Sequence, residues 1–245
     1  MEIPPAAWPT TVAEAAAEQD RLRPLVVPTG LLPSPLTTVA GLDVSYADDG
    51  RLVAAVVVLD ADTLAPLESA THVGRVAFDY VPGFFAFREL PALLAALADL
   101  GTVPDVLVCD GHGVAHPRRL GLACHLGVLT GLPTVGIAKT SLLGRYDEPG
   151  PRRGDASPLV DAGETVGRVL RTRDGVRPVY VSVGHRLGLD AACALALRLT
   201  PAYRLPETTR AADHLSRAVL AEHQRTGRTG MEGANLPAAR GGAGE

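Results

Sequence analysis

Apolar residues follow two periods along the chain: an alternation or short run typical of strands, and a three-to-four-residue spacing typical of helices. The strand-like pattern dominates the first third of the chain, and the two patterns alternate afterwards. The predicted strands cover residues 37–46, 52–59, 67–76, 106–109, 134–137, 165–172 and 178–183. The predicted helices cover residues 11–23, 87–100, 119–129, 191–199 and 208–223.

Cap and turn residues support several of these boundaries. Thr11 and Glu14 have the spacing of a capping box at the start of the first helix. Asp48-Asp49-Gly50 is a hairpin sequence between the first two strands. Three antiparallel strands followed by helix and strand alternation indicate an α/β fold with one mixed sheet flanked by helices. The predicted organisation is an irregular arm over 1–10, one domain over 11–223 with a surface loop at 146–163, and a disordered tail over 224–245.

Composition narrows the class of protein. The chain has 245 residues, of which 47% are hydrophobic and 20% charged, enough for one substantial core. No apolar run approaches the roughly 18 residues of a membrane span, and no signal-peptide pattern occurs at the N-terminus. The 3 cysteines are an odd number without CxxC spacing, which indicates neither a disulfide framework nor a zinc site. We therefore expect a cytoplasmic protein without a membrane partner, and we expect a monomer.

The charged residues include one basic residue that differs in type from all the others. The net charge of −4 does not favour nucleic acid as a partner, although it leaves room for local basic patches. Of the 23 basic residues all but Lys139 are arginine. Codon bias in a GC-rich genome explains the arginines. The single lysine also marks a position where a compact ammonium is able to do what a guanidinium cannot.

Three acidic residues stand where the predicted elements begin or end. Asp43 interrupts an apolar strand, where an unpaired carboxylate is costly. Asp110 follows the run 106–109, at the strand end where α/β sheets hold ligands, although a turn or capping role is as probable for this residue alone. Glu89 stands at the start of the Leu-rich helix, where a helix-dipole role is the ordinary explanation. Together they form a set of hard oxygen ligands that suits Mg²⁺, with Mn²⁺ as a substitute, and phosphodiester chemistry.

The segment that follows Asp110 adds polar groups to this set. The glycines of Gly111-His112-Gly113 allow close approach of backbone to a substrate, and Arg118 is placed to meet a phosphate. His116 has the chemistry to orient a water or shuttle a proton. The alternative, a histidine in a surface loop, is the commoner case for a single His.

Residues 80–87 gather most of the phenylalanines of the chain. The segment reads Tyr80-Val-Pro82-Gly83-Phe84-Phe85-Ala-Phe87 and is unusually apolar for a loop. One reading is a wedge that stacks on or between bases. The other is a loop that folds onto the core, an explanation that suits Phe87.

Taken together, these segments resemble the endonuclease V family, whose members nick DNA near deoxyinosine. The matching segments are Gly41-Leu-Asp43-Val-Ser-Tyr46, Tyr80-Val-Pro82-Gly83 with Phe87-Arg88-Glu89, Asp110 to Arg118, Gly121 to His125, Gly136-Ile-Ala-Lys139-Thr, and Arg204-Leu-Pro-Glu207-Thr-Thr-Arg210-Ala-Ala-Asp213. The resemblance spans about residues 11–222. The last segment has Thr208 where the family pattern has a second proline, and either Asp213 or His214 takes the fourth acidic position.

The resemblance implies a ribonuclease H-like fold and a set of roles. Mg²⁺ would be bound directly by Asp43 and Asp110, and Glu89 and Asp213 would complete the acidic set. Lys139 would contact the scissile region, and His116 would support the attacking water or the phosphate. Tyr80, in the Tyr80–Pro82 wedge, would enter the duplex while the flipped hypoxanthine base lies near the three glycines of the motifs, Gly83, Gly111 and Gly136. The partner would be double-stranded or single-stranded DNA containing deoxyinosine, cut at the second phosphodiester on the 3′ side to leave 3′-hydroxyl and 5′-phosphate ends.

Two other functions remain open at this stage. A nuclease of the same fold would act on inosine in RNA or on mismatched or branched DNA, because sequence does not show contacts to a 2′-hydroxyl. A non-catalytic nucleic-acid-binding module is the alternative of a different class. All four acidic positions are occupied, which argues against it.

Overall fold

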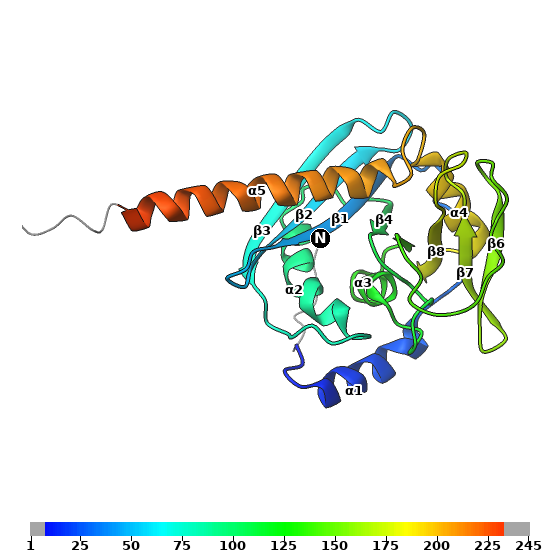
Figure 1. The fold of residues 1–245 in the computed structure, drawn as a ribbon, viewed down its shortest axis with the longest axis horizontal. Helices are drawn as coiled ribbons and strands as arrows, with labels where there is room; N and C mark the ends of the chain where they lie inside the picture. The colour runs from blue at the N-terminus through cyan, green and yellow to red at the C-terminus, as the bar shows by residue number, and fades with distance from the viewer. Residues whose placement is uncertain (1–7, 233–245) are drawn as a thin grey trace, which may run out of the picture.

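An eight-stranded mixed sheet runs through the computed structural model, which describes residues 8–232 (Figure 1). The strand order is β3-β2-β1-β4-β5-β8-β7-β6. The strands are β1 (Thr38–Tyr46), β2 (Arg51–Asp60), β3 (Pro66–Arg75), β4 (Val106–Cys109), β5 (Thr134–Ala138), β6 (Ala156–Asp161), β7 (Glu164–Leu170) and β8 (Val179–His185). The helices are α1 (Val12–Leu22), a 3₁₀ turn η1 (Arg23–Leu25), α2 (Phe85–Ala98), α3 (Leu122–Thr130), α4 (Leu189–Arg198) and α5 (Glu207–Glu232).

The sheet combines antiparallel and parallel pairs of strands. β1, β2 and β3 form an antiparallel meander, and β4 then adds to β1 in parallel. β5 adds to β4 in parallel, whereas β8 pairs with β5 in the antiparallel sense. The predicted α/β class, with three antiparallel strands followed by strand and helix alternation, is confirmed.

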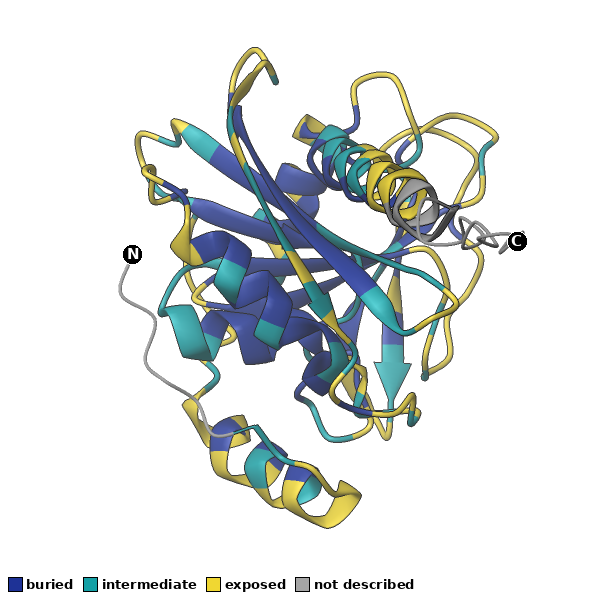
Figure 2. Ribbon diagram, turned by 90° about the vertical axis from the view of Figure 1, so that its left-hand side faces the viewer, coloured by how far each residue is buried: buried dark blue, intermediate teal, exposed yellow. Residues whose placement is uncertain are grey.

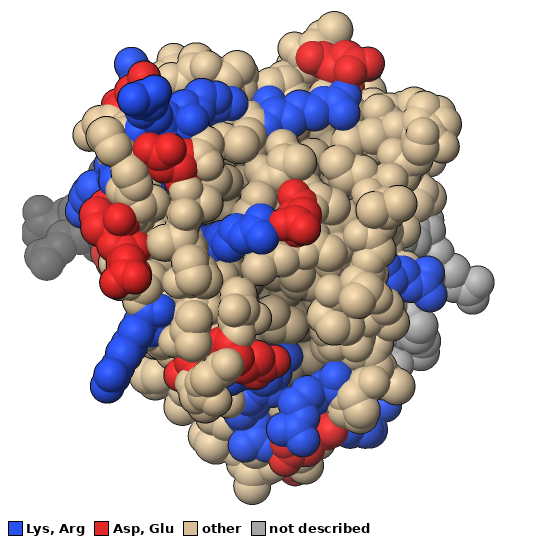
Figure 3. All heavy atoms as spheres, turned by 90° about the vertical axis from the view of Figure 1, so that its right-hand side faces the viewer, with Lys and Arg blue, Asp and Glu red and all other residues tan. Residues whose placement is uncertain are grey.

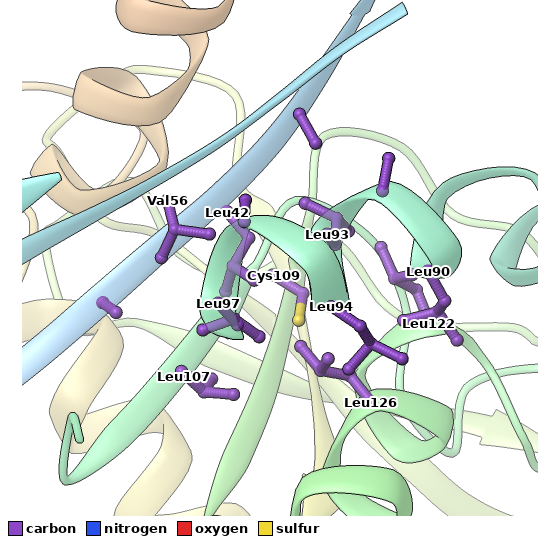
Figure 4. Packing of buried hydrophobic residues seen from close by; sticks show 14 of the residues in the cluster. Leu42, Val56, Leu90, Leu93, Leu94, Leu97, Leu107, Cys109, Leu122 and Leu126 are labelled. Atoms are coloured by element: carbon purple, nitrogen blue, oxygen red, sulfur yellow. The ribbon is translucent and has the colours of Figure 1, made fainter. Parts of the chain in front are cut away.

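Alternate residues of the central strands enter two different cores. On one face Leu42, Val56 and Leu107 pack against leucines of α2 and α3 (Figure 4). On the other face, Val39 and Val108 pack with apolar residues of α4 and with Ala212 of α5. Figure 2 shows the result: the centre of the sheet and the helices α2 and α3 are mostly buried, whereas the outer sides of α1 and α5 are exposed.

Helix α5 lies directly on β1 because Gly41 has no side chain. A Cβ at this position would come within 2.1 Å of the Thr208 backbone. The close approach brings the first turns of α5 next to the end of β1 that carries Asp43.

Most predicted boundaries are confirmed within a few residues, and the predicted capping box of Thr11 and Glu14 is present. The predicted surface loop at 146–163 is wrong in part, since it contains strand β6. Ser157 and Leu159 are the buried positions of this edge strand, and Pro158 between them weakens any strand pattern in the sequence.

Helix α5 also continues past the predicted end at residue 223, so the tail predicted from 224 begins too early. The helix projects from the body of the molecule (Figure 1), and its side chains at 221–226 are exposed, so burial imposes no apolar period on those positions. The remainder of the predicted tail, 233–245, and residues 1–7 of the predicted arm lie outside the described residues.

Candidate active site

Asp43 and Asp110 lie side by side because β1 and β4 are parallel neighbours. Leu42 pairs with Cys109 in the register, so the two aspartates follow at the same level of adjacent strands. Glu89 approaches them from the first turns of α2 and is only 5% exposed. The structure therefore brings together the three carboxylates that the sequence predicted for one site.

Mutual repulsion and burial act strongly on two of these carboxylates. Burial, together with the charges of Asp110 and Asp213, raises the pKa of Asp43 to about 6. Burial and the charges of Asp43 and Asp110 raise the pKa of Glu89 to about 8. The site thus gathers carboxyl groups in a place that is poorly solvated, where ionising all of them together is unfavourable.

This donor set fits a hard divalent cation. Carboxylate oxygens are the ligands that Mg²⁺ and Mn²⁺ prefer, and a dication would offset the burial and the mutual repulsion that raise the two pKa values. Across the described part of the chain, no three His, Cys, Asp or Glu side chains lie close enough together to hold an ion as they stand. The predicted ligands Asp43 and Asp110 therefore remain a prediction, with the donor chemistry in their favour.

Lys139 extends from the end of β5 to the same carboxylates. Its ammonium forms an ion pair with Asp110 Oδ2. Burial alone would lower the pKa of Lys139, but the hydrogen bond and charge of Asp110 raise it above its usual range. The guanidinium of Arg204 holds the Lys139 backbone carbonyl from the other side, with an N···O distance of 2.7 Å. The lysine is thus a protonated group with a fixed backbone beside the acidic set.

The fourth acidic position lies on α5, where Asp213 and His214 are both at the edge of the site. Asp213 is half-buried and its charge raises the pKa of both Asp43 and Lys139. Arg217, one turn along the helix, pairs with the Asp213 carboxylate at 2.8 Å. His214 is exposed and lines the same hollow. The electrostatic coupling favours Asp213 as the residue that completes the set.

Two hydroxyl groups that the sequence analysis did not assign hold the carboxylates. The Tyr46 hydroxyl donates a hydrogen bond to Glu89 Oε1 at 2.9 Å. Ser216 of α5 is fully buried and donates to Asp43 Oδ2 at 3.0 Å. Ser216 lies four residues after Ala212 and four before Leu220, on the buried face of α5. A polar residue on the buried face of a helix is the sequence feature that indicates a specific role for Ser216.

The aromatic segment divides into a core part and an exposed part. Phe87 is buried against the rings of Phe78 and Phe84, as expected for a core residue. Tyr80 is 67% exposed, and its ring forms an edge-to-face pair with Phe85 at a ring-centroid distance of 6.3 Å. The exposed ring stands at the mouth of a pocket, in a position suited to stacking on a base.

A tight turn shapes this segment. The Phe84 N–H donates to the Val81 carbonyl at 2.9 Å, with Pro82 and Gly83 between them. Gly83 has φ +85°, the left-handed conformation that a type II turn requires at its third position. Pro82 and Gly83 are therefore at the positions that such a turn favours.

A pocket of about 340 Å³ separates this turn from the carboxylates. Its wall includes Tyr80, Pro82, Gly83, Phe85, Asp110, Gly111, His112, His116, Leu122, Lys139 and Leu142. Gly136 does not line the pocket. It lies behind Gly111, where a Cβ would come within 2.6 Å of the Gly111 carbonyl, so this glycine lets the pocket wall approach β5.

A second hollow of about 530 Å³ runs along the start of α5. Its lining residues include Glu207, Arg210, Asp213, His214 and Arg217. Asp110 and Lys139 line both hollows. The charged pair therefore lies at the boundary between a mostly apolar pocket and a mostly polar groove.

His116 and Arg118 are engaged inside the protein. His116 is 5% exposed, and burial lowers its pKa to about 4, so its ring is neutral near pH 7. Arg118 donates to the Ala16 carbonyl of α1 at 3.1 Å and forms an ion pair with Asp20. The predicted phosphate contact of Arg118 stays a prediction, since its guanidinium is directed at α1.

The end of the molecule that carries β6 and β7 has charges of both signs in close alternation (Figure 3). Arg168 pairs with Asp190 at 2.6 Å and Arg171 pairs with Glu148 at 2.8 Å. Arg168 is paired at the surface, whereas Arg171 is buried and its guanidinium also donates to backbone carbonyls, so the two arginines do not form an exposed basic patch.

Comparison with known proteins identifies relatives that match most of the chain. Residues 20–214 match the family model described as Endonuclease V. The chain is 59% identical over 88% of its length to a protein named Endonuclease V from Streptomyces coelicolor, of which it covers 94%. It superposes with a TM-score of 0.86 on the crystal structure of Endonuclease V from Streptomyces avermitilis, at 57% identity, covering 90% of this chain and 97% of that one.

A more distant solved structure contains nucleic acid. Endonuclease V from Ciona intestinalis was solved in complex with a 24mer DNA containing an inosine followed by a ribo-adenosine. That chain is 27% identical to this one, with a TM-score of 0.77, and the match covers 86% of this chain and 98% of that one. None of the helices within residues 8–232 is both long and apolar enough to cross a membrane.

Proposed function

The chain belongs to the endonuclease V family, and we propose that it is a DNA repair endonuclease that recognises deoxyinosine and hydrolyses the second phosphodiester bond on its 3′ side. The structures of this family have a ribonuclease H-like fold, with which the observed sheet agrees. The proposed products have 3′-hydroxyl and 5′-phosphate ends. We propose that the enzyme is a monomer and that it is located in the cytoplasm.

One observation carries the proposal: Asp110 and Lys139 line both the apolar pocket and the polar groove. An enzyme that cuts near a damaged base must hold that base and the phosphodiester at separate but adjacent places. The pocket beside Tyr80 has the apolar wall and backbone groups that suit an extruded base. The groove beside α5 has the polar lining that suits a strand of nucleic acid.

The exposed ring of Tyr80 supports extrusion of the base. A flipped nucleotide leaves a gap in the duplex, and an aromatic ring inserted beside the gap recovers part of the lost stacking. Tyr80 and Pro82 are the exposed residues of the turn that forms one side of the pocket. They are the groups we assign to this role.

The acidic set would hold a divalent metal ion, with Mg²⁺ proposed and Mn²⁺ as a substitute. Asp43 and Asp110 would bind it directly, and Glu89 and Asp213 directly or through water. When bound, such an ion supplies Lewis-acid stabilisation of the phosphodiester and makes water more acidic. Ser216 and Tyr46 would keep the Asp43 and Glu89 carboxylates in position.

Lys139 would stabilise charge that develops on the phosphodiester oxygens. Its pKa is raised, so the ammonium stays protonated through the neutral range. The carbonyl of the same residue is bound by Arg204, which limits the positions that the side chain reaches. A preorganised cation of this kind acts without rearrangement during the reaction.

The proposal is tested with a panel of oligonucleotides that carry a single inosine or none. We expect nicking of deoxyinosine duplex and single strand at the second phosphodiester 3′ to the lesion, and loss of nicking in EDTA with recovery on addition of Mg²⁺. Matched RNA with inosine, and mismatched or branched DNA without it, belong to the same panel. Faster cleavage of any of these than of deoxyinosine DNA would assign the site to that substrate instead.

A further inference from the structure

A buried glutamine lies in the middle of the apolar face of α1. Ala15, Gln19 and Leu22 are the buried residues of this helix, and Gln19 is 1% exposed. Packing alone would favour an apolar residue there, because an amide without hydrogen bonds is costly to bury. Gln19 Oε1 is indeed without a hydrogen-bond partner among the residues that the structure describes. The NH₂ group of the side-chain amide must therefore explain why a glutamine occupies this buried position.

The amide N–H of Gln19 reaches the tight turn at the pocket. Gln19 Nε2 donates to the Gly83 carbonyl at 2.8 Å. The reverse orientation of the amide would place two acceptor oxygens against each other, so the assignment of Nε2 is fixed by its partner. The contact joins residues that are 64 positions apart in the chain.

His116 meets the same carbonyl from the other side of the turn. Its Nδ1 accepts the Arg118 N–H at 3.2 Å, so the proton of this neutral ring is on Nε2. Nε2 then donates to the Gly83 carbonyl at 3.0 Å. Two side chains, one from α1 and one from the loop after β4, thus hold a single backbone oxygen in the left-handed residue of the turn.

Helix α1 is itself held against the body at this point. Arg118 binds the Ala16 carbonyl and the Asp20 carboxylate, on either side of Gln19 in sequence. Ala15 packs with Phe78 and Phe87 beneath the turn, and Leu22 packs with Leu120 and Cys124. Figure 1 shows α1 beneath α2 and α3, at the edge of the domain.

We infer that α1 is part of the base-recognition device, and that Gln19 is a positioning residue which fixes the Val81–Phe84 turn and so the placement of Tyr80 and Pro82 beside the pocket. The inference rests on the proposed function for the identity of the base. It gives His116 the same positioning role, since both of its ring nitrogens are occupied within the protein. Gln19 acts through Gly83 and touches neither the carboxylates nor Lys139.

The test compares Gln19→Met with Glu18→Gln in the full-length protein. Methionine has nearly the same shape as glutamine but lacks the donor, and it is compatible with a helix. Glu18 precedes Gln19 and pairs with Arg21 at the surface, so its substitution controls for changes in the helix. Hydrogen exchange reports on the Phe84 amide that closes the turn, with the amides of β4 as an internal reference. Single-turnover nicking of deoxyinosine duplex, with undamaged duplex as competitor, reports on recognition.

In Gln19→Met, we expect exchange at Phe84 to become about fivefold faster, which corresponds to ~1 kcal/mol for one hydrogen bond. The enzyme concentration that gives half-maximal nicking should rise by about the same factor, while the maximal rate and inhibition by undamaged duplex stay within about twofold. Glu18→Gln should match the wild type in all measurements.

Unchanged exchange at Phe84 in Gln19→Met would overturn the inference. So would a general acceleration of exchange in β4, or equal losses of affinity for damaged and undamaged duplex, since these indicate a structural role only. A wild-type protein that does not nick deoxyinosine duplex would overturn the proposed function, and the exchange measurement would still decide whether Gln19 holds the turn.

Discussion

The ammonium of Lys139 and the carboxylate of Asp110 form an ion pair across the adjacent ends of β5 and β4. The two strands are parallel neighbours, so the pair is placed by the sheet and not by a flexible loop. The same two residues form the boundary between the base-sized pocket and the groove along α5. This relationship makes the only lysine of the sequence a component of the site.

Lys139→Arg keeps the charge but changes its shape, and we expect it to lower the single-turnover nicking rate by about 100-fold. A planar guanidinium is broader than an ammonium and displaces either Asp110 or the phosphate, and small misplacements at a reacting centre are costly. Arg75→Lys is the matched control, because Arg75 lies on edge strand β3, two strands from β1, and binds the Asp49 carbonyl of the β1–β2 hairpin. Wild-type nicking by Lys139→Arg would show that the retained lysine has no specific role.

Glu89→Gln tests whether ionisation of the buried Glu89 carboxyl destabilises the folded protein. The pKa of Glu89 is raised from 4.5 to about 8, so between these pH values the folded state holds a proton that the unfolded state has lost. Its contribution to the free energy of unfolding therefore falls as pH rises from about 4.5 to about 8. Without divalent metal ions, we expect Glu89→Gln to melt a few degrees higher than wild type at pH 8, with a difference that shrinks toward pH 5.

Thermal unfolding in EDTA at several pH values measures this effect. Glu222→Gln, a substitution of an exposed glutamate on α5, is the control and should leave the pH dependence of the melting temperature unchanged. A constant difference between Glu89→Gln and wild type at all pH values would contradict the raised pKa.

Ser216→Ala removes the hydrogen bond that holds Asp43. We expect nicking to fall by about 10-fold and the affinity for Mn²⁺ to fall with it, because groups that orient a metal ligand have effects of this size. Ser45→Ala is the matched control, since Ser45 binds the Ser216 hydroxyl at 2.8 Å and has no hydrogen bond to Asp43 among the described residues. Titration calorimetry with Mn²⁺ separates the two variants. Equal metal affinities in Ser216→Ala and wild type would remove Ser216 from the site.

Tyr80→Ala removes the exposed ring at the pocket. Base–aromatic stacking is worth about 1–3 kcal/mol, so we expect at least about a fivefold loss in affinity for deoxyinosine duplex with little change for undamaged duplex. Leu67→Ala, a large exposed apolar side chain on edge strand β3, is the control for nonspecific surface effects. Binding is measured by fluorescence anisotropy. A similar loss for both duplexes would show that Tyr80 contributes only general affinity.

The sequence predicts the strands and helices in which burial against the core imposes a clear pattern of apolar residues. β1, β2 and β4 are interior strands of the sheet, each with an unbroken run of buried residues, and their prediction is confirmed. β6 is an edge strand with few buried side chains and a proline, so its period is too weak to detect. Helix α5 continues beyond residue 223 with exposed side chains at 224–226, so burial gives the sequence no apolar period there from which to read the end of the helix.

The residues of the candidate site likewise divide into those that the sequence predicts and those that only the structure shows. Asp43, Glu89 and Asp110 were accessible to prediction because charged residues in apolar runs stand out, and the strand register brings the two aspartates together. Gln19 and Ser216 were not, since each is a common polar residue whose partner is more than 60 positions away. Their roles depend on helix placement, which the order of residues does not show.

The most direct test of the central claim is nicking by Asp110→Ala on a duplex with one deoxyinosine, with binding of the same duplex measured in parallel. The account predicts that nicking disappears while the dissociation constant stays within about a few-fold, because Asp110 serves the chemistry and the pocket and wedge hold the base. Asp62→Ala, at an exposed ion pair with Arg198, is the control and should keep both properties. Nicking by Asp110→Ala at the wild-type rate would contradict the account and place the reaction elsewhere on the molecule.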